Sequence, residues 1–366
     1  MKVRLGDYVL IKTGKLDANI ASENGRFPFF TCGVEPLKID KYSYDCECVL
    51  VAGNGDLNVK YYYGKFDAYQ RTYIIESKNK NLLSVKYLYF FLDNYLDTLR
   101  NEAIGGVIKY IKLSNLSEAK IKLLDLEKQL EIVNILEKIN LLISLRKNQL
   151  KKLDELVKFR FIEMFDNKKR LLVKMKDVCD FITKGATPNS SDIFNVYSEG
   201  VIPYIKVYNL SFNGELLFED KQQFIKQNVH ENLLKRSKVY PNDVLMNIVG
   251  PPLGKFALVT KQYKEWNVNQ AIAIFRSKSR ILPEFLLYSL MQPAVLKPFL
   301  DQAVGIRQLN ISLEQCRNIK IPLPDIDEQK EFVCLVEQTT KSKLEIQKSL
   351  DKLEILKKSL MQKYFG

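Results

Sequence analysis

The chain contains a long internal repeat, and this repeat constrains its fold more than any other feature of the sequence. Residues 103–133 (AIGGVIKYIKLSNLSEAKIKLLDLEKQLEIV) align without a gap with residues 303–333 (AVGIRQLNISLEQCRNIKIPLPDIDEQKEFV), at an offset of 200 residues. The identical pairs are Ala103/Ala303, Gly105/Gly305, Ile111/Ile311, Leu113/Leu313, Lys120/Lys320, Ile121/Ile321, Leu123/Leu323, Asp125/Asp325, Gln129/Gln329, Glu131/Glu331 and Val133/Val333. Because this period is much longer than that of a solenoid, the sequence predicts a duplicated module.

The front part of each module matches its counterpart more loosely. The segment LGDYVLIKTGK (5–15) parallels MKDVCDFITKG (175–185), and DCECVLVAGNG (45–55) parallels PNDVLMNIVGP (241–251). Each module is therefore a variable front followed by a more regular back. We expect the backs to share one task and the fronts to have diverged in theirs.

The backs, residues 126–165 and 326–366, each predict one long helix. Neither Gly nor Pro interrupts 126–165, and apolar residues recur there at helical spacing. One predicted buried stripe comprises Ile132, Ile135, Ile139, Leu142, Leu153 and Leu156, and a second comprises Val133, Leu136, Ile143, Leu150 and Val157. Asp325 and Glu328 have the spacing of a capping box at the start of the second helix. Two such helices in one chain can pair with each other.

The fronts, residues 1–125 and 166–325, predict two mixed α/β domains. They contain short runs of β-branched and aromatic residues that are separated by Gly and Asn, as is typical of strands joined by turns. Short helices at 83–101 and 283–301 are predicted to close each front. The predicted fold class is α/β (α+β), with two related domains that are each followed by a long helix.

No catalytic motif is complete. An adenine methyltransferase needs an Asn/Asp-Pro-Pro-aromatic tetrapeptide, but the Pro-Pro sequence here is Gly250-Pro251-Pro252-Leu253. The run from Gly250 to Lys255 is one residue too short for a phosphate-binding loop. We interpret Asp325 and Glu328 as a helix cap rather than a nuclease metal site. His230, the only histidine, has no evident catalytic partner. We therefore expect no enzyme activity, no cofactor and no metal.

Composition points to a cytoplasmic protein with a polyanionic partner. The net charge is +13, and the excess of Lys and Arg is largest in residues 166–325. The six cysteines are scattered, as is typical of reduced thiols. The sequence has neither a signal-peptide pattern nor an apolar run long enough to span a membrane, so no membrane association is expected.

The motifs together resemble the specificity (S) subunits of Type I restriction-modification systems. The segment IKIPLPDIDEQKEFV resembles their junction between recognition domain and helix, whereas the first junction, KIKLLDLEKQ, lacks its prolines. GRFPFFTCG and AGNGDLNVKYYYGKFDAYQRTYII resemble one subtype of recognition domain, and ITKGATPNSSD, IPYIKVYNL, NDVLMNIVG and GIRQLNIS resemble another. The resemblance implies an antiparallel coiled coil of the two helices between target-recognition domains 1–125 and 166–325. It also implies double-stranded DNA, two methyltransferase subunits and motor-nuclease restriction subunits as partners, in phage defence.

Base reading needs hydrogen-bonding side chains on loops or strands, together with Lys and Arg that hold phosphates. The DNA-binding candidates in the first front are Arg26, Asn54, Asn58, Lys60, Gln70, Arg71 and Lys109. Those in the second front are Lys184, Thr187, Asn189, Lys206, Asn209, Asn247, Lys255, Asn269, Gln270, Arg307 and Gln308.

Two alternatives stay open at this point. One is a duplicated protein-binding scaffold, without catalysis, whose helices serve only for dimerisation. The other is a self-contained methyltransferase or nuclease, which the missing motifs disfavour. Salt-dependent binding of duplex DNA would separate a DNA reader from a scaffold.

Overall fold

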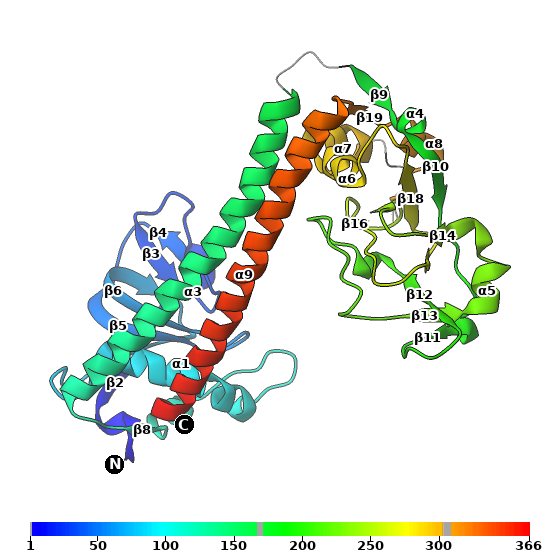
Figure 1. Cartoon of the computed structure of the whole chain (residues 1–366). Helices are drawn as coiled ribbons and strands as arrows, with labels where there is room; N and C mark the ends of the chain where they lie inside the picture. Colours follow the sequence, from blue (N-terminus) through cyan, green and yellow to red (C-terminus); the bar gives the residue numbers. More distant parts are fainter. Residues whose placement is uncertain (1, 167–170, 302, 304–308) are drawn as a thin grey trace. The chain divides into compact units, whose positions relative to one another are not determined.

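The structure is a computed structural model that describes residues 2–166, 171–301, 303 and 309–366 (Figure 1). It divides into a first unit, Met1–Gln149 with Ile346–Gly366, and a second unit, Leu150–Glu345. Among the helices of the described residues, none combines the length and the apolar character needed to cross a membrane.

The first unit is built on a sheet of six strands. The strand order is β2-β7-β5-β6-β3-β4, and helix α1 lies against β5 and β6. The elements are β1 (Lys2–Arg4), β2 (Val9–Thr13), β3 (Phe27–Phe30), β4 (Leu37–Ile39), β5 (Tyr44–Ala52), β6 (Val59–Ala68), β7 (Thr72–Ser77), α1 (Val85–Glu102), α2 (Leu113–Ser117), β8 (Lys120–Lys122) and the start of α3 (Leu126–Phe161), with 3-10 turns at Leu5–Asp7 and Ala18–Ile20.

The second unit contains sheets of four and five strands, in the orders β10-β18-β15-β16 and β11-β13-β12-β17-β14. A π-helical turn, Ile162–Asp166, follows α3. The strands are β9 (Leu172–Lys174), β10 (Cys179–Lys184), β11 (Ile193–Phe194), β12 (Val201–Ile205), β13 (Phe224–Lys226), β14 (Lys238–Val239), β15 (Val244–Asn247), β16 (Phe256–Leu258), β17 (Trp266–Val268), β18 (Ile272–Ser277) and β19 (Lys320–Pro322). The helices are α4 (Met175–Val178), α5 (Gln227–Glu231), α6 (Pro283–Met291), α7 (Pro293–Leu300), α8 (Leu313–Asn318) and α9 (Ile326–Phe365), with 3-10 turns at Ser190–Asp192, Val207–Asn209 and Lys235–Ser237.

The repeat in the sequence is a repeat in the fold. The order β2-β7-β5-β6 in the first unit has the same connectivity as β10-β18-β15-β16 in the second. Each unit also has a small antiparallel pair at the start of its long helix. Val3 pairs with Ile121 across β1 and β8, and Val173 pairs with Ile321 across β9 and β19. The predicted mixed α/β class is confirmed for both fronts.

The segments 5–15 and 175–185 contain equivalent strands, β2 and β10, which differ in length by one residue. Strand β10 has a register shift between Cys179 and Phe181, which adds one residue relative to β2. As a result, Gly14 corresponds to Gly185 rather than to Lys184. An added Cβ would lie 2.1 Å from the Ala68 carbonyl oxygen at Gly14, and 2.1 Å from the Asn269 carbonyl oxygen at Gly185. The close backbone approach therefore requires glycine at both positions.

The helix predicted at 283–301 is broken in the structure, whereas its counterpart α1 is continuous. Gln292 adopts an extended conformation (φ −64°, ψ 134°) between α6 and α7. The break has a local cause, because Pro293 lacks an N–H and disfavours the helical conformation of the residue before it.

The long helices pair in an antiparallel sense in each unit. Helices α3 and α9 are drawn in Figure 1. In the first unit the Lys147 ammonium of α3 lies 3.0 Å from the Glu354 carboxylate of α9, and Leu136 shares a core with Phe365. In the second unit the ring centroids of Phe161 and Phe332 lie 5.3 Å apart. Early residues of α3 thus meet late residues of α9, and late residues of α3 meet early ones.

The predicted stripe on the first long helix is only partly correct. Ile132 and Ile139 are buried, but Ile135, Leu142 and Leu156 are 40%, 46% and 42% exposed. The second stripe supplies the buried residues Val133, Leu136 and Val157. The buried face of the helix therefore combines residues from both predicted stripes and differs from the face that the first stripe alone indicates.

One glutamine per unit anchors the long helix to the domain before it. Gln129 Oε1 accepts a hydrogen bond from Ser84 N (2.9 Å), and its Nε2 donates to the Leu82 and Leu124 carbonyls. Gln329 makes the corresponding bonds, accepting from Leu282 N (2.8 Å) and donating to two backbone carbonyls. Both side chains are fully buried. Each buried amide therefore satisfies three backbone groups and has its own donors and acceptor occupied.

We predict that Gln129→Leu and Gln329→Leu each lower the free energy of unfolding by about 2–4 kcal/mol, because leucine keeps the volume but leaves buried backbone groups without partners. Urea unfolding followed by circular dichroism measures the change. Gln149→Leu, at an exposed position of α3, is the matched control and should shift stability by less than about 0.5 kcal/mol. Equal stability of all three variants would contradict the anchoring role.

Candidate nucleic-acid interface

Several loops of the first unit meet at one end of its sheet. Gly53 N donates to the Arg71 carbonyl (2.7 Å), and Gly55 N donates to the Lys109 carbonyl (2.9 Å). The Asn58 amide donates to the Cys32 carbonyl (2.8 Å). Segments 31–33, 53–58, 69–71 and 103–111 thus form what we call the first loop cluster.

Most of the residues that the sequence predicts to bind DNA in the first front lie in or beside this cluster. They differ in whether their side chains are exposed and free to bind a ligand. Gln70, Arg71 and Lys109 are exposed, and Asn54 is half-buried. The Asn58 amide is fully used, because it donates to two carbonyls and accepts from the Lys60 ammonium. Burial lowers the pKa of Lys60 from its ordinary value. Removing this ammonium from water costs free energy that a nearby anion would offset.

Arg26 lies apart from the first loop cluster. It precedes β3, whereas segment 31–33 follows this strand. Its guanidinium lies 5.8 Å from the centre of the Phe27 ring.

The second unit builds the same backbone frame. Ile248 N donates to the Ala271 carbonyl (2.8 Å), as Gly53 N does to Arg71. Gly250 N donates to the Leu309 carbonyl (2.9 Å), as Gly55 N does to Lys109. Ile311 N donates to Ile248 O and Ile111 N to Gly53 O, both at 2.9 Å. Segments 184–189, 205–206, 248–255, 269–271 and 309–311 form the second loop cluster.

Two asparagines predicted to bind DNA in the second front support loops instead. Asn209 is fully buried, and its amide contacts Lys206 N and the Leu217 and Lys221 carbonyls. Asn247 is also buried, donates to the Pro252 carbonyl (2.8 Å) and accepts from Lys255 N (2.7 Å). Their hydrogen-bonding groups are occupied by backbone, so they shape the loops that carry other side chains.

The remaining candidates of the second front lie on or beside the loop cluster. Lys184, Thr187, Asn189 and Gln270 are exposed. Asn269 has a buried Oδ1 without a hydrogen-bond partner among the described residues. Lys206 has its pKa lowered by burial, and Lys255 lies over the Phe212 ring at 5.6 Å. Arg307 and Gln308 lie outside the described residues.

A basic pocket that the sequence analysis missed opens on β10 and β18. It has a volume of about 460 Å³, and Lys235, Arg236, Lys238 and Arg276 contribute to its lining. Arg276 binds the buried Asp243 with two nitrogens, at 2.8 and 2.7 Å. Lys235 and Arg236 are exposed. These residues escaped notice because they do not lie at glycine-containing turns.

His230 belongs to a buried network rather than to a catalytic group. Its Nε2 lies 2.9 Å from Glu265, and its Nδ1 lies 3.1 Å from the Asn267 amide nitrogen. The hydrogen bond from His230 is the largest cause of a lowered pKa at Glu265. Glu231 completes a group with metal-ligating atoms. However, the Lys238 ammonium lies 2.6 Å from the Glu231 carboxylate and 3.5 Å from the Glu265 carboxylate, where it already offsets one of their two negative charges.

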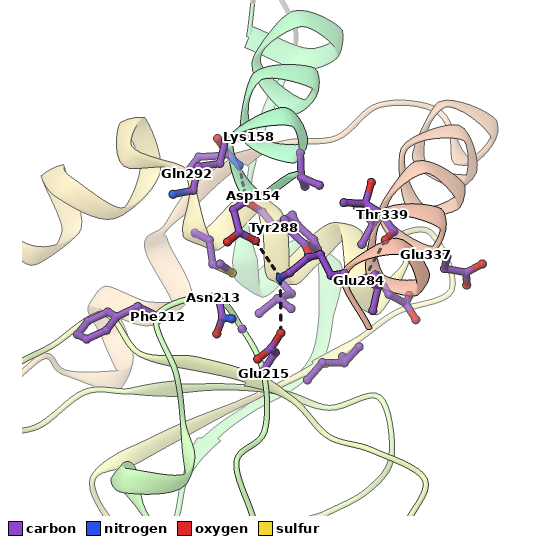
Figure 2. A pocket seen from close by; sticks show the side chains of 18 of the residues that line it. Asp154, Lys158, Phe212, Asn213, Glu215, Glu284, Tyr288, Gln292, Glu337 and Thr339 are labelled. Carbon is purple, nitrogen blue, oxygen red and sulfur yellow. Dashed lines mark hydrogen bonds and ion pairs between the residues drawn. The ribbon is translucent and has the colours of Figure 1, made fainter. Parts of the chain in front are cut away.

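A cavity in the second unit has a lining of mixed charge. It holds about 840 Å³ between α3, α6, α9 and the loop at 212–215 (Figure 2). Lys343 points toward Asp154 (2.8 Å) and Glu215 (3.7 Å) and is neutralised by them. Glu284 and Glu337 also line the cavity, and so do Lys158 and Lys341, so its carboxylates and ammonium groups nearly balance. The cavity therefore lacks the excess of positive charge that phosphates require, and the loop clusters remain the candidate interface.

Comparison with known proteins decides the family. The family model for the Type I restriction modification DNA specificity domain matches residues 1–155 and 168–356. The chain belongs to this family. The two matched segments contain the two loop clusters and most of both long helices.

Several relatives are specificity subunits of Type I restriction enzymes. The EcoDI specificity subunit of Escherichia coli is 34% identical over 156 residues, 43% of this chain and 34% of that protein. The EcoBI subunit of the same species is 36% identical over 28% of this chain and 22% of its own length. The matches thus span about a third and about a fifth of these two relatives. The MjaVIII subunit of Methanocaldococcus jannaschii is 24% identical, covering 96% of this chain and 90% of that protein.

Solved structures show the same fold. The S subunit of a Type I restriction-modification system from M. genitalium aligns with a TM-score of 0.61 and 16% identity, covering all of this chain and 96% of that one. A chain from a study of complex assembly and conformational transition of the Type I system aligns with the same score and identity, covering all of this chain and 97% of that one.

We predict that Asn247→Ala lowers the free energy of unfolding by about 1–3 kcal/mol, because Lys255 N and the Pro252 carbonyl lose their partner. Gln270→Ala, at an exposed position nearby, should change stability by less than about 0.5 kcal/mol. Thermal unfolding of the full chain measures both. A stable Asn247→Ala protein would contradict the supporting role of Asn247.

Proposed function

We propose that this chain is the DNA-reading specificity subunit of a Type I restriction-modification complex and performs no catalysis itself. Residues 1–125 and 166–325 each read one half of a split sequence in double-stranded DNA. The observation that carries this proposal is the loop cluster built twice, with the same backbone hydrogen bonds but different side chains. A duplicated frame with variable side chains suits a protein that must recognise two different half-sites.

The proposal assigns different tasks to the candidate residues. Exposed side chains contact DNA directly, with Lys and Arg on phosphates and amides or hydroxyls on base edges. The exposed ones are Gln70, Arg71 and Lys109 in the first unit and Lys184, Thr187, Asn189 and Gln270 in the second, and the half-buried Asn54, Lys255 and Asn269 are assigned the same task. Asn58, Asn209 and Asn247 hold the loops in place.

Partners follow from the same family membership. Two methyltransferase subunits would bind to the repeated surfaces, and restriction subunits would join them on chromosomal DNA in the cytoplasm. Exposed apolar side chains on the long helices support protein partners. In the first unit Leu141, Leu142 and Leu145 of α3 are 58%, 46% and 49% exposed, and Ile355 of α9 is 69% exposed.

The scaffold alternative is less favoured. A helical dimerisation element explains the long helices, but it does not explain why both domains present polar and basic side chains at equivalent loops. The family match covers these domains as well as the helices.

We predict that the full chain with its methyltransferase subunit methylates adenine at one split sequence, and that the chain alone transfers no methyl group. Methylome sequencing of cells that carry both genes, compared with each gene alone, tests this. Methyl transfer by the highly purified chain alone would contradict the proposal, as would methylation without sequence preference.

Charge removal at the first loop cluster should weaken DNA binding in a salt-dependent manner. For Arg71→Ala and Lys109→Ala, we predict that the slope of log affinity against log salt becomes shallower by about one per lost phosphate contact. Fluorescence anisotropy with a duplex target measures it in the assembled complex. Lys41→Ala is the control. This exposed lysine precedes strand β5, whereas segment 53–58 of the cluster follows the other end of that strand. An unchanged slope for both variants would remove these residues from the interface.

The two fronts should be exchangeable. Replacing residues 1–125 with the corresponding front of a related S subunit should change one half of the methylated sequence and preserve the other. Methylome sequencing of the chimaera shows which half changed, and replacement of 166–325 is the reciprocal control. A change in both halves would show that the domains do not read independently.

A further inference from the structure

The loop between Ile104 and Tyr110 exposes an apolar tip in the first loop cluster. Val107 is fully exposed and Ile108 is 63% exposed. Gly105 (φ +119°) and Gly106 precede this pair and turn the chain outward. Large apolar side chains grouped at one exposed point commonly mark a binding surface.

The base of this loop is held firmly. Ile104 N donates to the Tyr110 carbonyl (3.0 Å), and Tyr110 N donates back to the Ile104 carbonyl (2.8 Å). The Gly55 N–H donates a hydrogen bond to the Lys109 carbonyl (2.9 Å), which connects the loop to segment 53–58. The tip is therefore presented at a defined place and does not need to be ordered by its ligand.

The surroundings of the tip favour DNA as its ligand. Lys109 follows the tip directly, and Arg71 and Asn54 lie on the loops that the tip's base contacts. One exposed carboxylate, Asp56, lies in the same cluster. DNA offers apolar surface beside phosphates in two forms, the 5-methyl group of thymine in the major groove and the base faces at an opened step.

We propose that Val107 and Ile108 make the apolar base contact of the first unit within its half-site, while Lys109 holds an adjacent phosphate. This inference rests on the proposed function, because it takes the first loop cluster to face DNA. It adds a specificity-determining contact that the polar candidates do not supply.

The test uses the full chain assembled with its methyltransferase subunit and the duplex identified by methylome sequencing. For the double variant Val107→Ser/Ile108→Ser, the dissociation constant for this duplex should rise about ten- to a hundredfold, because apolar burial is lost. The salt slope should stay unchanged, since no charge is removed. Leu82→Ser, at a 50% exposed position outside the cluster, is the matched control and should bind like the wild type.

Two modified duplexes identify the form of the contact. If the tip reads a methyl group, replacing one thymine of the first half-site by uracil weakens the wild type but not the double variant. If the tip enters the base stack, 2-aminopurine at one step brightens with the wild type and not with the double variant. A response in either duplex supports the contact, and a response in neither overturns it.

Two other results would overturn the inference. One is wild-type affinity of the double variant, and the other is loss of assembly with the methyltransferase subunit, which would make the tip a protein contact. Failure of the proposed function looks different, because the wild-type complex itself would then show no preference for the duplex.

Discussion

The rest of the structure depends on the buried glutamine at the start of each long helix. Gln129 and Gln329 are fully buried, and each side chain satisfies three backbone groups. A side chain that lacked either a donor or an acceptor could not do this, since both kinds of backbone group are present. The bonds fix the first turn of the long helix to the start of α1 or α6. Each helix therefore leaves its domain from one defined point, and its pairing in that unit follows from there.

The backs of the modules could be predicted from the sequence because their signals are local. A helix without Gly or Pro, with a capping residue before it, is recognised from spacing alone, and α3 and α9 begin within one residue of the predicted starts. The helix face was harder to predict. Ile135 and Leu142 fit helical spacing but are exposed, because the buried face depends on which residues of the other helix pack against it. The bulge after Cys179 was missed for a similar reason, since register depends on the neighbouring strand β18.

For the candidate site, residue type and turn position were enough to select neighbouring segments, but they did not separate exposed side chains from those that support loops. The candidates were Asn, Gln, Lys and Arg residues near glycine-containing turns. The fold brings these turns together because they end neighbouring strands. This choice could not distinguish Gln270, which is exposed, from Asn247, whose amide bonds a neighbouring loop. Asparagine serves equally well for base recognition and for loop support, and only burial separates the two. A search for polar residues also passes over apolar ones, which is why Val107 escaped it.

The duplicated frame explains how the fronts could diverge so far without losing their architecture. Its equivalent hydrogen bonds join backbone atoms, so they tolerate different side chains at the same place. Lys109 in one unit and Leu309 in the other both use their carbonyl to accept from a glycine N–H. At such positions a change of side chain alters what the surface can bind while the loop keeps its course. At Gln129 and Gln329 the side chain itself makes the hydrogen bonds, so a change of residue would remove them. Both modules have the same residue at this position. The shared glutamine is therefore explained by the bonds of its side chain, and the different residues at 109 and 309 by a bond that only their backbone makes.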